Sequence, residues 1–216
     1  MRLREEHPVK IEHIAPADIE KRSMEIIDQE LGNITFPEDK RDIIKRVIHT
    51  TADFEFARTM RFSDDAVARG LDALKRGATI LTDTNMACTG ISAVSLKKLG
   101  GQKVCYMADP EIAAIAKKNG STRATASMDK ACDIEGPLII AIGNAPTALL
   151  RLAELIEADK IHPDLVIGVP VGFVNVIASK EAIMKCHVPY IVATGRKGGS
   201  AIAAAICNAL IYRLTR

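Results

Sequence analysis

The sequence contains no tryptophan, and only 4% of its 216 residues are aromatic. Proteins that bind single-stranded nucleic acid stack its bases on aromatic side chains, so this class is disfavoured. The formal net charge of +2 also argues against a protein that coats nucleic acid. We therefore expect no nucleic-acid partner, and an anionic ligand would have to be held by donors placed locally.

Long apolar segments and paired cysteines are lacking as well. The most apolar stretch, residues 201–211, is too short to span a bilayer, and the first ten residues contain no apolar core of a signal peptide. The five cysteines are widely separated and odd in number, which disfavours a disulfide framework and a metal site. We expect a cytoplasmic protein with no metal and no membrane partner.

The common nucleotide and hydrolase motifs are also absent. There is no G-x-x-x-x-G-K-[ST], and no G-x-G-x-x-G follows the first expected strand, where TDTNMACTG stands instead. P-loop and dinucleotide-binding proteins are thus disfavoured. The lack of G-x-S-x-G and H-E-x-x-H argues against α/β-hydrolases and zinc proteases. The expected protein binds a small molecule without an obvious cofactor.

What the chain does contain is an alternation of short apolar runs and helical patterns. The first third reads as helices, and five apolar runs then follow at residues 78–82, 103–107, 137–142, 164–169 and 190–194. Continuous apolar strands separated by helices predict a doubly wound α/β fold with a mainly parallel sheet of about five strands. We expect one domain over residues 1–216, with a helical extension (1–62) before the parallel-sheet core (63–216).

A polar or glycine-rich segment follows each expected strand. These segments are DTNM (83–86), ADP (108–110), GNAPT (143–147), PVGFVN (170–175) and TGRKGGS (194–200). Ligands of doubly wound proteins bind at the carboxyl ends of the strands, and exposed N–H groups of helix starts bind anions. Alternatively, these are the turn residues that any α/β protein needs, and the pattern alone does not decide.

One histidine, His49, lies beside the apolar side of a predicted helix over residues 38–54. Asp42, Arg46, His49 and Asp53 form a second stripe on this helix. A histidine titrates near neutral pH, which suits proton transfer, and an arginine one turn away would hold a substrate carboxylate. Alternatively, the stripe is a solvated face with Asp42–Arg46 and His49–Asp53 pairs, and the pattern alone favours that interpretation.

Two further residues have both a structural and a functional interpretation. Ser23 falls within the apolar stripe of the first helix, where it either bonds back to its own helix or offers its hydroxyl to a ligand. Arg123 falls in the first turn of a helix that Ser121 or Thr122 would cap. A cation there opposes the helix dipole, so Arg123 either binds an anion or is simply solvated.

Taken together, these motifs resemble a known family. KRSMEII, RVIH, ILTDTNM, NGSTRA, AIGNAPTALL, GVPVGFVN and GRKGGSAIAAA occur in that order, and the resemblance to the precorrin-8X methylmutases of cobalamin biosynthesis covers about residues 11–214. It implies an isomerase that moves a methyl group from C-11 to C-12 of a corrin-type macrocycle by a 1,5-sigmatropic shift, giving hydrogenobyrinate or its cobalt counterpart. It also implies an α/β homodimer with active sites near the subunit interface, a carboxylate-rich corrinoid substrate and no cofactor.

The resemblance also implies roles for particular residues. His49 would be the proton donor, and Arg46, Ser23 and Arg123 would bind the substrate. We add that Asp53 or another acid could keep His49 charged by raising its pKa. The motif around Arg123, NGSTR, has one residue more than the family pattern. Further substrate-binding candidates for the carboxylate rim come from the segments after the strands: Asp83, Asn85, Asn144, Arg196 and Lys197.

Two rival functions remain at this point. The AIGNAPT turn would serve as the adenosyl loop of a methyltransferase that uses S-adenosylmethionine, although TDTNMACTG is a poor version of the glycine-rich loop of such enzymes. A non-catalytic carrier would sequester a reactive tetrapyrrole and would not need His49 for turnover. DTNM is more similar to the family members that handle the cobalt-containing substrate.

Overall fold

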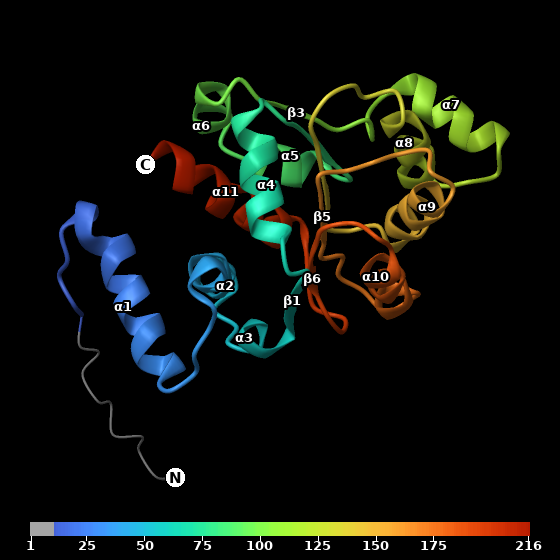
Figure 1. Ribbon diagram of the computed structural model, residues 1–216. Helices are drawn as coiled ribbons and strands as arrows, with labels where there is room; N and C mark the ends of the chain where they lie inside the picture. The colour runs from blue at the N-terminus through green and yellow to red at the C-terminus, as the bar shows by residue number, and fades with distance from the viewer. Residues whose placement is uncertain (1–10) are drawn as a thin grey trace, which may run out of the picture. The chain divides into compact units, whose positions relative to one another are not determined.

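The computed structural model describes residues 11–216, and the chain divides into two compact units between Ile34 and Thr35. The smaller unit contains a short 3-10 helix, Pro16–Asp18, followed directly by α1, Ile19–Leu31 (Figure 1). The helix α1 ends at Gly32, whose φ of 56° is a conformation that glycine adopts without steric cost.

The larger unit alternates helices and strands along the chain. Its elements, in order, are α2 Glu38–Thr51, α3 Phe56–Thr59, β1 Met60–Phe62, α4 Ala66–Lys75, β2 Thr79–Thr82, α5 Asn85–Gly90, α6 Ala93–Lys98, β3 Gln102–Val104, α7 Pro110–Lys118, α8 Arg123–Ala131, β4 Leu138–Ile142, α9 Pro146–Glu157, β5 Leu165–Gly168, α10 Val176–Lys185, β6 Tyr190–Ala193 and α11 Ser200–Thr215.

The sheet is six-stranded, with the order β1-β6-β5-β4-β2-β3. Strands β2 to β6 pair in parallel, which confirms the predicted mainly parallel sheet. The sixth strand, β1, was not predicted, and it pairs antiparallel with β6, with Met60 opposite Ala193. Three residues with an arginine between two apolar side chains give too short a pattern to indicate a strand.

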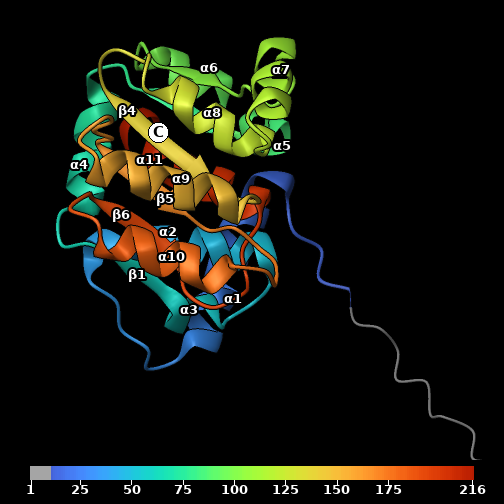
Figure 2. The ribbon, with the colours of Figure 1, turned by 90° about the vertical axis from the view of Figure 1, so that its right-hand side faces the viewer.

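Helices cover both faces of this sheet, as Figures 1 and 2 show. On one face, α11 packs against α2, α4, α5 and α6, and on the other α9 packs between α8 and α10. Every residue of β4 and β5 is buried, which explains their continuous apolar sequences. Among the described residues, no helix combines the length and the apolar character needed to cross a membrane.

Residues 35–62 pack with the sheet core, although we had expected them in the helical extension. Helix α2 packs on α11, where the carboxylate of Asp42 near the start of α2 accepts a 2.6 Å hydrogen bond from Nε of Arg213 near the end of α11. Helix α2 ends at Thr51, since Ala52 adopts a left-handed conformation (φ 52°, ψ 28°). The prediction that the helix continues through residue 54 is therefore wrong.

Candidate active site

The parallel strands β2, β4, β5 and β6 place the loops that follow them along one edge of the sheet. We call these loops, residues 83–84, 143–145, 169–175 and 194–199, the carboxyl edge. All but one of the substrate-binding candidates that follow the strands lie on the loops themselves, and Asn85 opens α5 directly after one of them. The geometry of this edge therefore decides what the candidates can do.

Asp83, directly after β2, ties two of these loops together. Its carboxylate is 1% exposed, with Oδ1 accepting the N–H of Gly143 at 2.9 Å and Oδ2 accepting those of Asn144 at 2.8 Å and Ala145 at 2.6 Å. Burial raises the pKa of the Asp83 carboxyl, while the three N–H donors act in the opposite direction. Both oxygens are used inside the protein, so Asp83 shapes the loop and leaves the exposed Asn144 facing solvent.

A hydroxyl pair joins the same loops to the start of α11. Thr84 caps α5 by accepting the N–H of Ala87 at 3.1 Å, and its hydroxyl lies 2.7 Å from that of Ser200. Gly143 lies so close to this helix start that a Cβ atom would be 2.7 Å from the Cα of Ser200. Asn85, the first residue of α5, is exposed beside this contact.

The loops after β5 and β6 are interlocked through their backbones. The N–H of Gly199 donates to the carbonyl of Val169 at 2.8 Å, and that of Gly172 donates to the carbonyl of Arg196 at 3.2 Å. A Cβ atom on Gly198 would lie 2.1 Å from the Val169 oxygen, so only glycine fits there. The guanidinium of Arg196 is exposed and lies 5.5 Å from the ring centre of Phe173.

His49 lies in the last turn of α2, and its side chain is exposed. Within residues 11–216 its ring makes no hydrogen bond or ion pair. The prediction that Asp53 continues the stripe of His49 is wrong, because the helix ends before it. Instead the Asp53 carboxylate accepts a 2.5 Å bond from Nζ of Lys197, which also lies 2.8 Å from Glu55.

This ion pair brings the end of α2 to the carboxyl edge. The hydrogen bond from Lys197 lowers the pKa of Asp53, and the two carboxylates raise the pKa of Lys197. The side chains are partly exposed, so the pair adds little stability. Its consequence is geometric, since it connects the turn after His49 with the loop of Arg196 and Lys197.

Arg46 lies one helical turn before His49 on α2. Its guanidinium lies 5.4 Å from the ring centre of Tyr212, near the far end of α11. Tyr212 is twelve residues from Ser200, a distance of about 18 Å at the usual rise of an α-helix. Arg46 thus contacts α11 near its C-terminus, while α11 begins at the carboxyl edge.

Arg123 is the first residue of α8 and is exposed. Thr122 caps the helix by accepting the N–H of Thr125 at 3.1 Å, which confirms one of the two caps that we predicted. The same hydroxyl lies 3.0 Å from that of Thr147 in the first turn of α9. Since α9 follows β4, this contact places Arg123 at the carboxyl edge.

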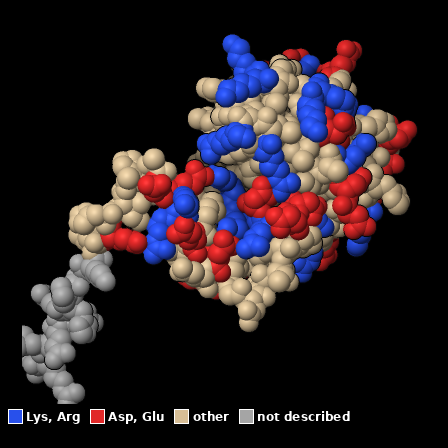
Figure 3. Space-filling view, turned by 60° about the vertical axis from the view of Figure 1, so that its left-hand side comes forward, with Lys and Arg blue, Asp and Glu red and all other residues tan. Residues whose placement is uncertain are grey.

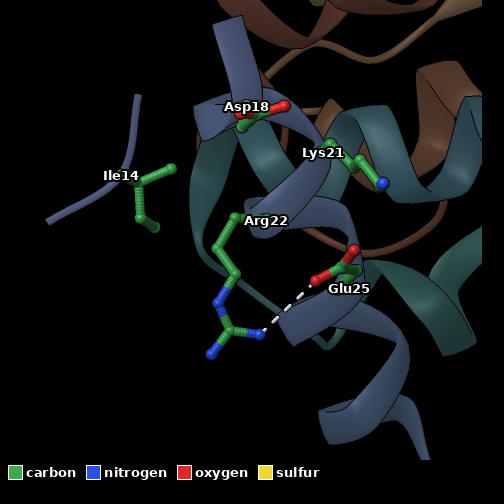
Figure 4. Close-up of a pocket in the computed structure, with 5 residues that line it drawn as sticks. All are labelled: Ile14, Asp18, Lys21, Arg22 and Glu25. Atoms are coloured by element: carbon green, nitrogen blue, oxygen red, sulfur yellow. Dashed lines mark ion pairs between the residues drawn. The ribbon is translucent and has the colours of Figure 1, made fainter. Parts of the chain in front are cut away.

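Ser23 belongs to the smaller unit, and its hydroxyl donates to the carbonyl of Ile19 at 2.9 Å within the same helix. Neighbouring side chains of α1 line a shallow pocket of about 160 Å³, in which Arg22 lies 3.6 Å from Glu25 (Figure 4). Pockets for small organic ligands usually hold about 300–1,000 Å³, so this one is too small for a macrocycle. Its full lining is Ile14, Asp18, Lys21, Arg22 and Glu25.

Charge on the surface is mixed. On the face in Figure 3, Lys and Arg side chains are interspersed with Asp and Glu. This mixture agrees with the small net charge of +2, and Arg123 and Arg196 are both exposed. Among the described residues, no three His, Cys, Asp or Glu side chains gather as ligands for a metal ion.

Comparison with known proteins now places the chain. The sequence model of a family described as precorrin-8X methylmutase matches residues 18–213. The chain belongs to the precorrin-8X methylmutase family. As a methylmutase it is an isomerase, an intramolecular methyl transferase, and this excludes the predicted alternative of a methyltransferase that uses S-adenosylmethionine.

Individual precorrin-8X methylmutase relatives match over most of the chain. The cobalt-precorrin-8 methylmutase of Salmonella typhimurium is 47% identical over 173 residues, 80% of each chain. That of Priestia megaterium is 43% identical over 197 residues, 91% of this chain and 88% of its own. The solved structure of precorrin-8x methyl mutase from Thermus thermophilus is 42% identical and covers 92% of this chain and 97% of its own, with a TM-score of 0.83.

Several residues in or beside the carboxyl edge were not predicted from the sequence. Thr84 and Ser200 join two loops, and the GGS sequence before α11 was the only local signal for the latter. Phe173 is 82% exposed, which no apolar pattern indicates. Lys180 is buried on α10, where a charged residue is expected to be exposed.

Proposed function

We propose that the chain catalyses the methyl shift from C-11 to C-12 of precorrin-8X or cobalt-precorrin-8. The observation that carries this proposal is the interlocked carboxyl edge, which presents separate cations to solvent in a chain of this family. An intramolecular shift needs no phosphate, hydride or external methyl donor. Its requirements are a rigid site for a carboxylate-rich ring and one acid.

His49 is the proposed acid. Its imidazolium donates a proton to a pyrrole-type nitrogen, which makes the conjugated ring electron-poor. The methyl group then leaves C-11 and bonds to C-12 within the same molecule, and the proton returns to His49. Exposure, the absence of a competing partner within residues 11–216, and the Asp53–Lys197 link to the carboxyl edge support this role.

Substrate carboxylates would be bound at the carboxyl edge. Arg123 and Arg196 are exposed there, and Lys197 would exchange Glu55 for a carboxylate of the substrate while keeping its bond to Asp53. Helices α10 and α11 begin at this edge without a side-chain cap, so their first N–H groups are further donors. Asn85 and Asn144 offer amides, and Asp83 acts by orienting the loop that carries Asn144.

An absorption spectrum followed over time tests this function directly. The purified protein, mixed with precorrin-8X or with cobalt-precorrin-8, is expected to convert the spectrum to that of the methyl-shifted corrin. Because the Salmonella and Priestia relatives are named for the cobalt form, we expect faster conversion of cobalt-precorrin-8. A spectrum that changes once on binding and then stays constant would instead support a tetrapyrrole carrier.

A homodimer with its active sites near the subunit interface is part of the proposal. Val171, Phe173, Val174 and Ile177 form an exposed apolar patch that a partner would cover. Sedimentation equilibrium should give twice the chain mass of 23.3 kDa, and a monomer during turnover would contradict the dimer.

The cytoplasmic location stays a prediction.

A further inference from the structure

The side chain of Lys180 is buried within the larger unit. It lies on α10, is 1% exposed, and its Nζ donates to the carbonyls of Gly195 and Lys197, both at 2.8 Å. No carboxylate of residues 11–216 pairs with it. An ammonium group without a counter-ion is costly to bury, so its retention requires a reason beyond packing.

The reason lies in the loop that Lys180 holds. Residues 194–199 connect β6 to α11 and belong to neither element. The carbonyl of Gly199 accepts the N–H groups of Ile202 and Ala203 in α11, whereas those of residues 195–197 find their partners elsewhere. The carbonyls of Gly195 and Lys197 accept from Lys180, and that of Arg196 between them accepts from Gly172. Three successive carbonyls are thereby fixed by groups outside the loop.

We propose that Lys180 is a positioning residue for the methyl shift, because it fixes the backbone from which Arg196 and Lys197 reach the substrate. This inference rests on the proposed substrate-binding role of those two side chains. Arg196 lies over Phe173, and Lys197 pairs with Asp53 beyond the end of α2. A shift of this backbone would therefore misplace two substrate contacts and loosen the link to the turn after His49.

The pH dependence of the free energy of unfolding provides a second measurement on Lys180, independent of enzyme activity. Burial is the cause that lowers its pKa from 10.5 to about 8. The elements that pack on α10 carry other titratable side chains, none of which contributes to this shift: Arg151, Glu154, Glu157, Tyr190, Arg196 and Lys197.

The direction of the stability change follows from this pKa. Between pH 8 and 10.5 the folded chain binds fewer protons at this site than the unfolded chain. This difference makes the free energy of unfolding rise with pH across this window. The Lys180→Met variant has no titratable group here and should lack this contribution. Urea unfolding of both proteins at several pH values measures the difference.

Substitution of Lys180 by methionine is the main test. The variant keeps the length of the side chain but donates no hydrogen bond, so we expect KM for the corrinoid to rise by about tenfold, with a smaller change in kcat. Amide hydrogen exchange of residues 195–199 should accelerate in the same variant. Lys185→Met, an exposed change on the same helix, is the matched control and should alter neither quantity.

Two further variants keep the test decisive. Lys180→Arg retains a charged donor and should recover part of the affinity, whereas a purely space-filling role predicts no recovery. If Lys180→Met does not fold, Lys180→Gln replaces it. The shorter glutamine side chain is expected to keep at most one of the two bonds to the carbonyls of Gly195 and Lys197. Unchanged KM and unchanged exchange in a folded variant would overturn the proposal.

A double-mutant cycle separates this proposal from the function on which it rests. If Lys180 acts through Arg196, the effect of Lys180→Met on KM should shrink in an Arg196→Ala background. Additive effects would contradict that route. If Arg196→Ala and Lys197→Ala leave KM unchanged, the proposed substrate contacts are wrong, while the exchange of residues 195–199 still shows whether Lys180 fixes the loop.

Discussion

Replacement of His49 by alanine should lower kcat by about 10²–10⁴-fold, the usual contribution of a general acid, and leave KM nearly unchanged. The ring is exposed at the end of α2 and bonds to no described residue, so its loss removes the proton donor without disturbing the packing. The free energy of unfolding should accordingly change by less than about 0.5 kcal/mol. Stopped-flow spectra with saturating substrate measure kcat, and urea unfolding measures stability.

A second histidine provides the control for this result. His162 is also exposed, but it lies between α9 and β5, at the opposite end of the strands from the carboxyl edge. His162→Ala should therefore turn over at the wild-type rate. Equal rates for wild type and His49→Ala would keep the isomerase and remove His49 as its acid, and another group would then have to protonate the ring.

The parts of the fold that could be predicted are those encoded in contiguous sequence. Strands β2, β4, β5 and β6 are largely apolar and buried because both faces of the sheet are covered, whereas the edge strand β3 is polar and only partly buried. Each of the five parallel strands lies within a few residues of its predicted place. Strand β1 depends on its pairing with β6 rather than on its own three residues. The end of α2 at Ala52 could not be predicted, because alanine rarely adopts the left-handed conformation that stops this helix.

The candidate site was predictable to a lesser extent, for a related reason. Exposed residues such as Arg123 and Arg196 follow local signals, namely a helix start and a glycine-rich segment after a strand. Asp83 and Lys180, which fix the loops around the exposed residues, have no such local signal in the sequence. Asp83 binds backbone N–H groups about sixty residues further along the chain, and any sequence there would offer the same donors. The burial of Lys180 likewise depends on a loop that lies beside α10 only in the folded protein.

Asp83→Ala is expected to cost about 3–5 kcal/mol of unfolding free energy, the largest effect on stability among the changes considered. Three backbone N–H groups lose their acceptor, and each buried donor left without a partner costs about 1–3 kcal/mol unless the loop moves to meet water. Movement of the loop would displace Asn144 and the start of α9, so turnover should fall as well. Urea unfolding and the spectral assay measure the two effects.

Asp83→Asn distinguishes the loss of an acceptor from the loss of volume. An amide oxygen at the Oδ2 position still accepts from Asn144 and Ala145, but the amide nitrogen then faces the N–H of Gly143. This variant should therefore lose about 1–3 kcal/mol, less than alanine. As the control, Asp109→Ala removes a carboxylate that accepts a single N–H, from Glu111, and should cost about 1 kcal/mol. Equal losses in the Asp83→Ala and Asp83→Asn variants would show that size, and not acceptor geometry, matters at Asp83.

The pH dependence of stability provides a separate test of the same carboxylate. Because the pKa of Asp83 is raised above its ordinary value of 3.8, the folded chain binds more protons here than the unfolded chain once the pH exceeds 3.8. The stability contributed by this group thus decreases as the pH rises from 3.8 through the folded pKa, and Asp83→Asn removes that dependence. A wild-type minus Asp83→Asn difference with the opposite slope would show that the three N–H donors outweigh burial. In that case the three N–H donors would favour the ionised carboxylate of Asp83, and the loop of residues 143–145 would become more stable as the carboxyl loses its proton.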